Sequence, residues 1–438
     1  MKKLLSIVFA FAVSVAQAQT FPVQNLVVNG LSSFAGATSL VGPSTFTLSP
    51  AMPTPAAGDN STKGVNSAFV AGHSPCPSIL DNGGDNTGVA PNNSAFATTA
   101  AIGPAGSACV YFPPGTYAFS SQATYTLPTN KASITLLGAG QDVTVLTWAA
   151  GGGLNLNFSG SSNSAHIRNM SLLTGTTATG SAITFNQQNS VLNPAGSAIS
   201  DVTNVTIRGS DGYASTDYWS NGITANISSV NFYGVAIFGA GTRTGTGINL
   251  GGTATIIPAG FNISGCTFNY VNIGINYGAY VQGVTISQSG FVADNYGVNV
   301  PSGLTGLDGL YAWGSTFDTY TSGIVTNSEV PNVLISGDIF IQEVSSQGIN
   351  LFNSAYFSIV GNSFNPGAAG SNKYGIVVGN SVAPGAIVGN SFFGMNNNAI
   401  YLQSTSSGVN VQSNTYSGNA TNITNSAGAA NTVGGGSQ

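Results

Sequence analysis

The second half of the chain repeats one pattern of apolar and polar residues. Each repeat has an alternating segment, then an aromatic residue, then a second apolar segment that usually begins with Gly–Ile. Alternation with a period of two is typical of a β-strand that buries one face. The aromatic residues are 23, 26, 23, 24, 28 and 24 positions apart, namely Phe268, Phe291, Phe317, Phe340, Phe364, Phe392 and Tyr416.

This spacing predicts an all-β solenoid, a parallel β-helix in which each repeat forms one coil. Strands of neighbouring coils lie about 4.8 Å apart, so we expect each aromatic residue to stack on the next one inside the solenoid. Less regular alternation at residues 134–136, 166–172, 205–207 and 230–232 indicates earlier coils.

Changes in composition predict both ends of the solenoid. Asn92 to Ile102 is rich in Ala and has neither Gly nor Pro, which favours a short helix capping the open end of the coils. After Thr424 the chain is mostly Gly, Ala, Ser and Asn. We therefore expect a β-helix domain over residues 76–424 and a flexible tail over 425–438.

The first 18 residues have the pattern of an export signal. Lys2 and Lys3 precede an apolar run from Leu4 to Val15, and Ala16–Gln17–Ala18 fits a cleavage site. The run is too short to span a bilayer comfortably. Residues 1–18 are therefore predicted to be the signal peptide of a secreted protein, with an uncleaved N-terminal anchor as the alternative.

The composition excludes one class of partner. Only 5% of the 438 residues are charged, yet 42% are hydrophobic, so the chain is not a disordered polar polymer. We expect a neutral surface rich in hydroxyl and amide groups. With a net charge of −5 and only eight Lys and Arg residues, no nucleic-acid partner is expected, because neutralising phosphates requires clustered cations.

The chain has three cysteines. Cys76 and Cys109 flank the start of the β-region, and an oxidising compartment would permit a disulfide between them. The sequence leaves the pairing open. Cys266 lies in a strand pattern and is expected to be a small core residue.

Asn recurs two residues before the coil aromatic, at Asn362, Asn390 and Asn414, with Asp338 one coil earlier. Asn tolerates a left-handed backbone at tight bends, and stacked Asn side chains form hydrogen bonds along their column. This column resembles the asparagine ladder of pectate-lyase-type β-helices. The resemblance implies that Asp338 is a ladder member rather than a catalyst.

Two segments resemble known families. The first comprises residues 79–87, 92–96 and 110–117, and it is similar to the opening of right-handed parallel β-helix domains of the pectate-lyase superfamily. There, the acidic turn and the cap are structural, which implies the same for Asp81 and Asp85.

The second segment, Gly58–Val70, resembles phage tail-fibre proteins, and residues 25–46 resemble tail-fibre shafts. Together these segments imply a tailspike, with a shaft or attachment segment over 19–75 and a β-helix body. A homotrimer and other phage tail components as partners are implied by the same resemblance. An export signal is not typical of that family. A secreted protein encoded by the host bacterium therefore stays an alternative.

Three acidic residues on successive coils are catalytic candidates. Residues one and three positions after the coil aromatic should point outward, and Asp294, Asp318 and Glu343 occupy such positions. Neighbours among them should lie roughly 8 Å apart, inside the window of about 6.5–9.5 Å for an inverting glycosidase pair. Tyr320 and Trp313 are expected to stack on sugar rings. The alternative is a set of scattered solvated carboxylates.

The insertion at residues 211–219 is a second candidate. It carries Asp211, Asp217, Tyr218 and Trp219, and loops that protrude from solenoids commonly carry function. These residues are candidates to bind a sugar or a calcium ion. The alternative is a turn packed by its own aromatic residues.

Other sites are not indicated by the sequence. The Arg-x-Pro-x-x-Arg motif of pectate lyases and the Gly-His-Gly of polygalacturonases are absent. His73 and His166 are interpreted as structural or solvated. No metal cluster, phosphate loop or nucleophile–base pair is evident, so no metal and no cofactor are predicted.

The sequence favours a tailspike-like protein, in the virion tail or secreted, that binds bacterial surface polysaccharide and depolymerises it if the candidate acids are catalytic. Such an enzyme would more readily be a hydrolase than a lyase. The alternatives are a secreted polysaccharide-degrading β-helix enzyme and a non-catalytic glycan-binding adhesin. The sequence does not decide whether the protein is an enzyme.

Overall fold

The computed structural model describes residues 76–102, 106–128, 131–160, 163–187, 200–226, 230–344, 346–367, 370, 372–380 and 384–434. The predicted signal peptide (1–18), the predicted attachment segment (19–75) and His73 lie outside these residues. No helix within them is long and apolar enough to cross a membrane.

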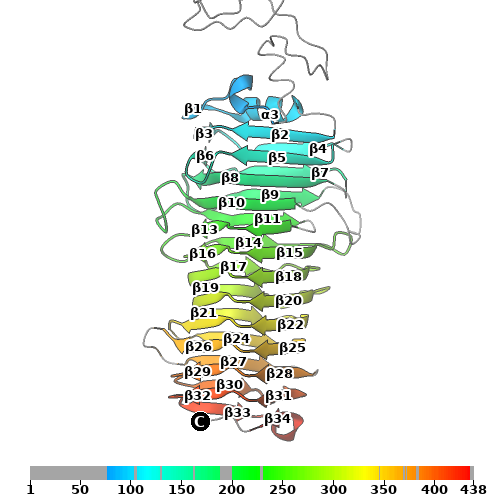
Figure 1. Cartoon of the computed structure of the whole chain (residues 1–438), viewed down its shortest axis with the longest axis vertical. Helices are drawn as coiled ribbons and strands as arrows, with labels where there is room; N and C mark the ends of the chain where they lie inside the picture. The colour runs from blue at the N-terminus through cyan, green and yellow to red at the C-terminus, as the bar shows by residue number, and fades with distance from the viewer. Residues whose placement is uncertain are drawn as a thin grey trace, which may run out of the picture. The chain divides into compact units, whose positions relative to one another are not determined.

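The described residues form a parallel β-helix whose coils follow one another along the solenoid axis (Figure 1). Strands one coil apart pair in parallel throughout, in three stacks that we call faces 1, 2 and 3. This confirms the predicted all-β fold class, a right-handed parallel β-helix.

Four long strands turn a corner and serve two faces each. They are β8 (Ser164–Thr174) and β10 (Ser200–Gly209), on faces 1 and 2, and β19 (Gly290–Val300) and β21 (Thr316–Thr326), on faces 2 and 3. The other strands of face 1 are β2 (Ser107–Phe112), β5 (Ser133–Gly138), β12 (Val230–Tyr233), β15 (Ala259–Ser264), β18 (Gln282–Ser287), β20 (Asp308–Trp313), β22 (Pro331–Ser336), β25 (Ala355–Val360), β28 (Gly385–Val388), β31 (Val409–Gln412) and β34 (Thr432–Val433).

The remaining strands complete the other two faces. Face 2 has β1 (Thr87–Pro91), β3 (Gly115–Phe119), β6 (Thr144–Trp148), β13 (Ala236–Phe238), β16 (Thr267–Asn269), β23 (Ile339–Gln342), β26 (Ser363–Pro366), β29 (Ser391–Phe393) and β32 (Thr415–Ser417). Face 3 has β4 (Ala123–Leu127), β7 (Leu154–Phe158), β9 (Thr179–Gln187), β11 (Trp219–Asn226), β14 (Thr246–Leu250), β17 (Ile273–Asn276), β24 (Gln347–Phe352), β27 (Tyr374–Gly379), β30 (Asn398–Leu402) and β33 (Thr421–Asn425).

The predicted aromatic column is confirmed and lies inside the solenoid. From Phe268 to Phe392, neighbouring rings are stacked with centroids 4.6–4.9 Å apart. The last step, from Phe392 to Tyr416, is 5.6 Å. Each ring between the two ends of the column therefore makes a face-to-face contact with the coil before it and the coil after it.

The recurring Gly of the Gly–Ile pairs is explained by this column. At Gly323, an added Cβ would lie 2.6 Å from the carbonyl oxygen of Gly348 and 2.6 Å from Cδ1 of Phe340. The same close approach to a Phe ring of the next coil recurs at Gly247, Gly274, Gly297, Gly348 and Gly375. The Gly residues thus make room for the large rings.

We expect Gly323→Ala to lower the free energy of unfolding by about 1–3 kcal/mol, because the methyl group overpacks the core. Gly290→Ala is the matched control, because its Cβ would approach only Val292, at 3.9 Å. Urea unfolding of the two variants measures the difference. Equal losses of stability in both would show that the Phe340 contact is not the cause.

The predicted polar ladder is also confirmed, and Asp338 belongs to it. The backbone N–H groups of Asp338, Asn362 and Asn390 each donate to the side-chain oxygen of the next member, all at 2.9 Å. One coil earlier, the N–H of Ser315 donates to Oδ1 of Asp338 at 2.6 Å. The column therefore satisfies buried backbone donors at the corner between faces 1 and 2.

The N-terminal end is closed as predicted. Helix α3 (Asn93–Ile102) lies over the first coil, and its Phe96 is buried against Phe112 and Phe119. The short helix η1 (Ile79–Asn82) precedes it. Asp85 caps the intervening turn by accepting from the N–H groups of Thr87, Val89 and Ala90. Cys76 and Cys109 form a disulfide, and Cys266 is buried.

The C-terminal boundary differs from the prediction of a flexible tail from residue 425. Residues 428–430 form the short helix η2 (Gly428–Ala430), and β34 then pairs with β31. Asn431 fixes this segment, because its side chain accepts from the N–H of Val409 and donates to Ser406. The solenoid therefore continues to at least Val433.

Candidate functional site

Asp318 and Glu343 come together at the corner between faces 2 and 3. Asp318 points outward from β21, and Glu343 follows β23 one coil later. The side chain of Glu343 lies close enough to raise the pKa of Asp318 by hydrogen bonding as well as by charge, so the two groups are nearer than the roughly 8 Å expected from strand geometry. Burial, with the charge and the hydrogen bond of Glu343, raises the pKa of Asp318 to about 6. Two carboxyl groups in contact hold a proton between them.

The expectation that Asp294 points outward is wrong. Ala293 adopts a left-handed backbone with φ of 57°, and the pairing of β19 with β21 shifts register there. This bulge turns Asp294 inward, where it is fully buried and accepts from the N–H of Val271 at 2.9 Å. Burial is the main reason that its pKa is raised well above the usual range. Asp294 therefore does not reach solvent beside Asp318.

Two basic residues that sequence reasoning missed lie beside these acids. The guanidinium of Arg243 stacks on the ring of Tyr320 at 3.4 Å, and its Nε donates to the carbonyl of Ala293 at 2.9 Å. The ammonium of Lys373 is buried and donates to the carbonyl of Gln342 at 2.8 Å. Burial lowers the pKa of Lys373, and the charge of Glu343 opposes this effect.

The aromatic candidates of this region differ in exposure and position. One face of Tyr320 is covered by Arg243, so that face is not open to a sugar. Trp313 is 42% exposed but ends β20 on face 1, where it pairs with Ser287 and Ser336. It therefore belongs to another face of the solenoid than Asp318.

The insertion at 211–219 is a turn held by its own side chains. Asp211 accepts from the N–H and the hydroxyl of Thr216 and from the N–H of Asp217. Asp217 accepts from the hydroxyl of Ser210 at 3.2 Å. Although burial opposes it, these hydrogen bonds lower the pKa of Asp211 to about 2. The alternative interpretation, a self-packed turn, describes Asp211 better than a ligand site does.

Trp219 is not a surface residue, so its prediction as a sugar-binding side chain is wrong. It begins β11 and lies 3% exposed in the core, edge-on to Trp148 with ring centroids 5.9 Å apart. Tyr218 before it is half-buried. The aromatic residue that the insertion exposes is Tyr213, which donates to Oδ2 of Asp142 at 2.9 Å and is stacked by Arg208.

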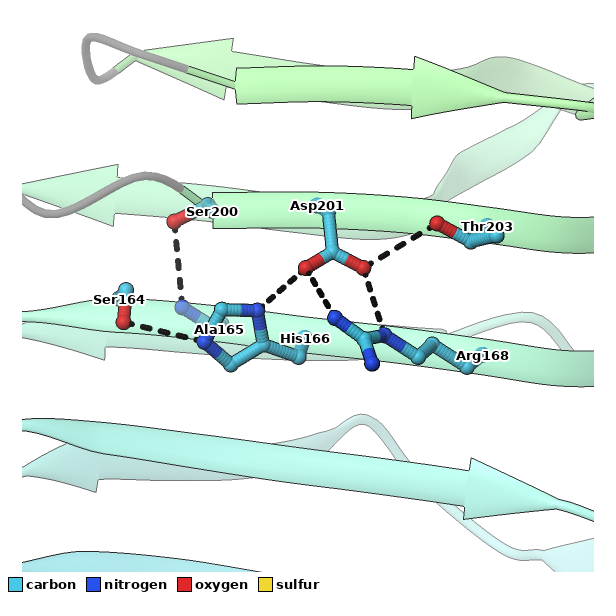
Figure 2. A network of polar contacts seen from close by, with 7 residues as sticks. All are labelled: Ser164, Ala165, His166, Arg168, Ser200, Asp201 and Thr203. Atoms are coloured by element: carbon cyan, nitrogen blue, oxygen red, sulfur yellow. Dashed lines mark hydrogen bonds and ion pairs between the residues drawn. The ribbon is translucent and has the colours of Figure 1, made fainter.

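A second polar network on face 1 was not predicted (Figure 2). His166 contacts Oδ2 of Asp201 through Nδ1 and lies 3.3 Å from the hydroxyl of Ser164 through Nε2. Arg168 donates to both oxygens of Asp201 at 2.8 Å. Burial would raise the pKa of Asp201, but the hydrogen bonds from His166 and Arg168 outweigh it and hold the pKa below its usual range.

Two of the grooves on the described surface are lined mainly by polar side chains. One, of about 590 Å³, is lined by His166, Arg168, Asn169, Asp201, Thr203, Asn204, Asn231 and Tyr233. The other, of about 420 Å³, is lined by Gly303, Leu304, Asn327, Ser328, Glu329, Asn353, Ser354, Ala355 and Asn380. Within the described residues, no group of three or more His, Cys, Asp or Glu side chains is placed to hold a metal ion.

The fold and these surfaces define a parallel β-helix protein with polar sites on its outer faces. No family model matches the chain, and no curated protein matches it. Among solved structures it is similar to the A-module of mannuronan C-5 epimerase AlgE4 of Azotobacter vinelandii, at 14% identity and a TM-score of 0.47, over 82% of this chain and 100% of that one.

Two further solved structures are similar. One is the catalytic unit of the GH87 α-1,3-glucanase of Streptomyces thermodiastaticus, at 13% identity and a TM-score of 0.47, over 83% of this chain and 68% of that one. The other is tailspike protein 3 of bacteriophage CBA120, at 14% identity and a TM-score of 0.41, over 82% of this chain and 61% of that one. At these values the likeness assigns no activity to this chain.

Proposed function

We propose that this protein binds bacterial surface polysaccharide as a tailspike-like spike and hydrolyses it at the corner between faces 2 and 3. The observation that carries the proposal is the contact between Asp318 and Glu343. Burial, together with the charge and hydrogen bond of Glu343, raises the pKa of this half-buried, outward-pointing carboxyl group to about 6. A carboxylic acid that stays protonated near neutral pH is what protonation of a glycosidic oxygen requires.

Asp318 acts as the proton donor in this proposal, and Glu343 keeps it protonated. Because the two side chains are in contact, they cannot enclose a water molecule as the two acids of an inverting enzyme do. Arg243 lies on the ring of Tyr320, two residues after Asp318, and supplies positive charge and donors for an acidic or hydroxyl-rich sugar. In this proposal Asp318 is the only catalytic carboxyl group.

The proposal predicts that Asp318→Asn lowers the rate of polysaccharide cleavage by about 100-fold or more, the usual contribution of general acid catalysis. The purified protein is incubated with surface polysaccharides of candidate host bacteria. Binding and the release of reducing or unsaturated ends are both followed. Asp308→Asn is the matched control, because Asp308 is an acid of face 1 that is paired with Asn332.

Glu343→Gln separates the proposed role from a structural one. Removing the charge of Glu343 should lower the pKa of Asp318, so the activity should decline at a lower pH than in the wild type. If Asp318→Asn released reducing ends from the polysaccharide as fast as the wild type, the proposal would be contradicted. Unsaturated ends would identify a lyase instead.

A non-catalytic adhesin is the second candidate, and the groove at Asn327, Asn353 and Asn380 favours it. Its amide and hydroxyl side chains suit hydrogen bonding to neutral sugars. Binding without the release of ends would support this function. A homotrimer, an extracellular or virion-tail location and contact with other tail components stay part of the tailspike proposal.

A further inference from the structure

The network around His166 has the arrangement of a nucleophile, a base and an orienting carboxylate. Ser164 and His166 are two residues apart on β8, so both side chains point to the same side of the strand. Asp201 of β10 pairs directly with His166 in the next coil. The parallel register therefore sets the three groups in a row across two coils, as Figure 2 shows.

The contacts fix which ring nitrogen carries the hydrogen. The carboxylate of Asp201 can only accept, so Nδ1 of His166 donates to it. In the neutral ring, Nε2 then has a free lone pair, which faces the hydroxyl of Ser164 at 3.3 Å. This is the orientation in which a histidine takes the proton of a serine nucleophile.

Asp201 is held in place independently of His166. The Nε and Nη2 of Arg168 donate to its two oxygens, and the hydroxyl of Thr203 donates to Oδ1 at 3.2 Å. Arg168 is thus a positioning residue, which keeps the carboxylate ionised and aimed at the imidazole. A pure ion pair between Arg168 and Asp201 would need neither His166 nor Ser164.

The arrangement spans one pair of coils and is not repeated in the coils on either side. In the preceding coil the same positions are Ser133 and Thr135, which pair with Ser164 and His166, so the serine is present without the base. In the following coil Asp201 pairs with Asn231. His166 is also part of the wall of the 590 Å³ groove, together with Asn204, Asn231 and the exposed ring of Tyr233.

We propose that Ser164, His166 and Asp201 form a second catalytic site, which hydrolyses carboxylic esters such as O-acyl groups on a sugar held in the neighbouring groove. This activity is separate from cleavage of the polysaccharide backbone at Asp318.

The reaction proceeds in two balanced steps. The Oγ of Ser164 bonds to the acyl carbon while Nε2 of His166 takes the hydroxyl proton. The ester C–O bond then breaks, and the alcohol leaves with that proton. Water next attacks the acyl-serine with His166 again as the base, which releases the carboxylic acid and restores Ser164.

The test uses small probes, because Ser164 is only 6% exposed. The full chain is treated with diisopropyl fluorophosphate and analysed by intact mass and peptide mapping, and p-nitrophenyl acetate hydrolysis is measured in parallel. We expect a single adduct on Ser164 and a hydrolysis rate that falls at least about 100-fold in Ser164→Ala and in His166→Ala. Ser133→Ala should retain both the adduct on Ser164 and the wild-type rate of acetate hydrolysis.

Ser164→Ala removes only a hydroxyl and leaves the contacts among His166, Arg168 and Asp201, so it separates loss of the nucleophile from loss of the fold. Circular dichroism checks that each variant is folded. A wild-type protein that gives no adduct on Ser164 and hydrolyses the acetate no faster than Ser164→Ala overturns the proposal. A purely structural network would shift the thermal midpoint without any adduct.

Discussion

Asp338→Asn is expected to stabilise the solenoid by roughly 4 kcal/mol at pH 8. Asp338 is buried in the asparagine column, and burial raises its pKa from the ordinary 3.8 to about 7. A shift of about three pKa units corresponds to roughly 4 kcal/mol. Its Oδ2 has no hydrogen-bond partner, so the ionised form is a poorly solvated charge.

An asparagine at position 338 would repeat the contacts of its neighbours. The Nδ2 groups of Asn362, Asn390 and Asn414 donate to the carbonyls of Ile335, Ile359 and Ile387. By the register of the coils, the amide nitrogen introduced by the substitution would donate to the carbonyl of Ala312. The substitution therefore removes a charge and adds a hydrogen bond to the column.

The effect should depend on pH in a defined direction. Because the folded pKa of Asp338 is raised, the native state binds the proton more tightly, and stability falls as the pH rises from about 4 to about 7. The advantage of Asp338→Asn should thus be smallest at pH 4, grow up to about pH 7 and then level off. Thermal or urea unfolding of both proteins from pH 4 to pH 8 measures it.

Asn362→Asp is the reciprocal control. It places a carboxyl group at the next position of the same column and should destabilise the protein increasingly as the pH rises. A constant difference between wild type and Asp338→Asn at all pH values would show that ionisation of Asp338 is not involved.

Phe317→Ala should lower the free energy of unfolding by about 3–5 kcal/mol, the usual cost of deleting a buried aromatic ring. Phe317 is fully buried, with Phe291 stacked at 4.6 Å on one side and Phe340 at 4.9 Å on the other. The deletion leaves a cavity that these rings cannot close without breaking their contacts with the next coils.

Tyr416→Ala serves as the comparison, because Tyr416 is stacked on one side only, against Phe392. Hydrogen exchange should show the loss of protection in Phe317→Ala spreading to β19 and β23, and in Tyr416→Ala staying near the C-terminal coil. Equal and purely local losses would contradict the view that the column couples neighbouring coils.

The repeat made most of the fold predictable. Phe291 and Asn390 occupy the positions expected from the spacing of the repeat, because every coil presents the same environment to the same residue type. Asp294 was misplaced because a single left-handed residue, Ala293, turned the strand and reversed the alternation. Nothing in the local sequence marks that bulge.

The sites were less predictable because they depend on pairs of coils of unequal length. Asp201 lies 35 residues after His166, well beyond the usual repeat, so the sequence did not indicate that the two side chains meet. Arg243 and Lys373 likewise come from other coils than Asp318. The spacing predicted that Asp318 and Glu343 lie on neighbouring coils, but it placed their side chains too far apart.

The stacked column of Phe rings has a consequence for how such a chain changes in evolution. Neighbouring coils present nearly the same stacking surface. A whole coil can therefore be deleted or duplicated, and the coils on either side of the change still stack on each other. Where two residues from adjacent coils act as a pair, a deletion or duplication between those two coils would separate them. Natural variants should therefore keep the coils of Asp318 and Glu343 adjacent, and likewise the coils of His166 and Asp201.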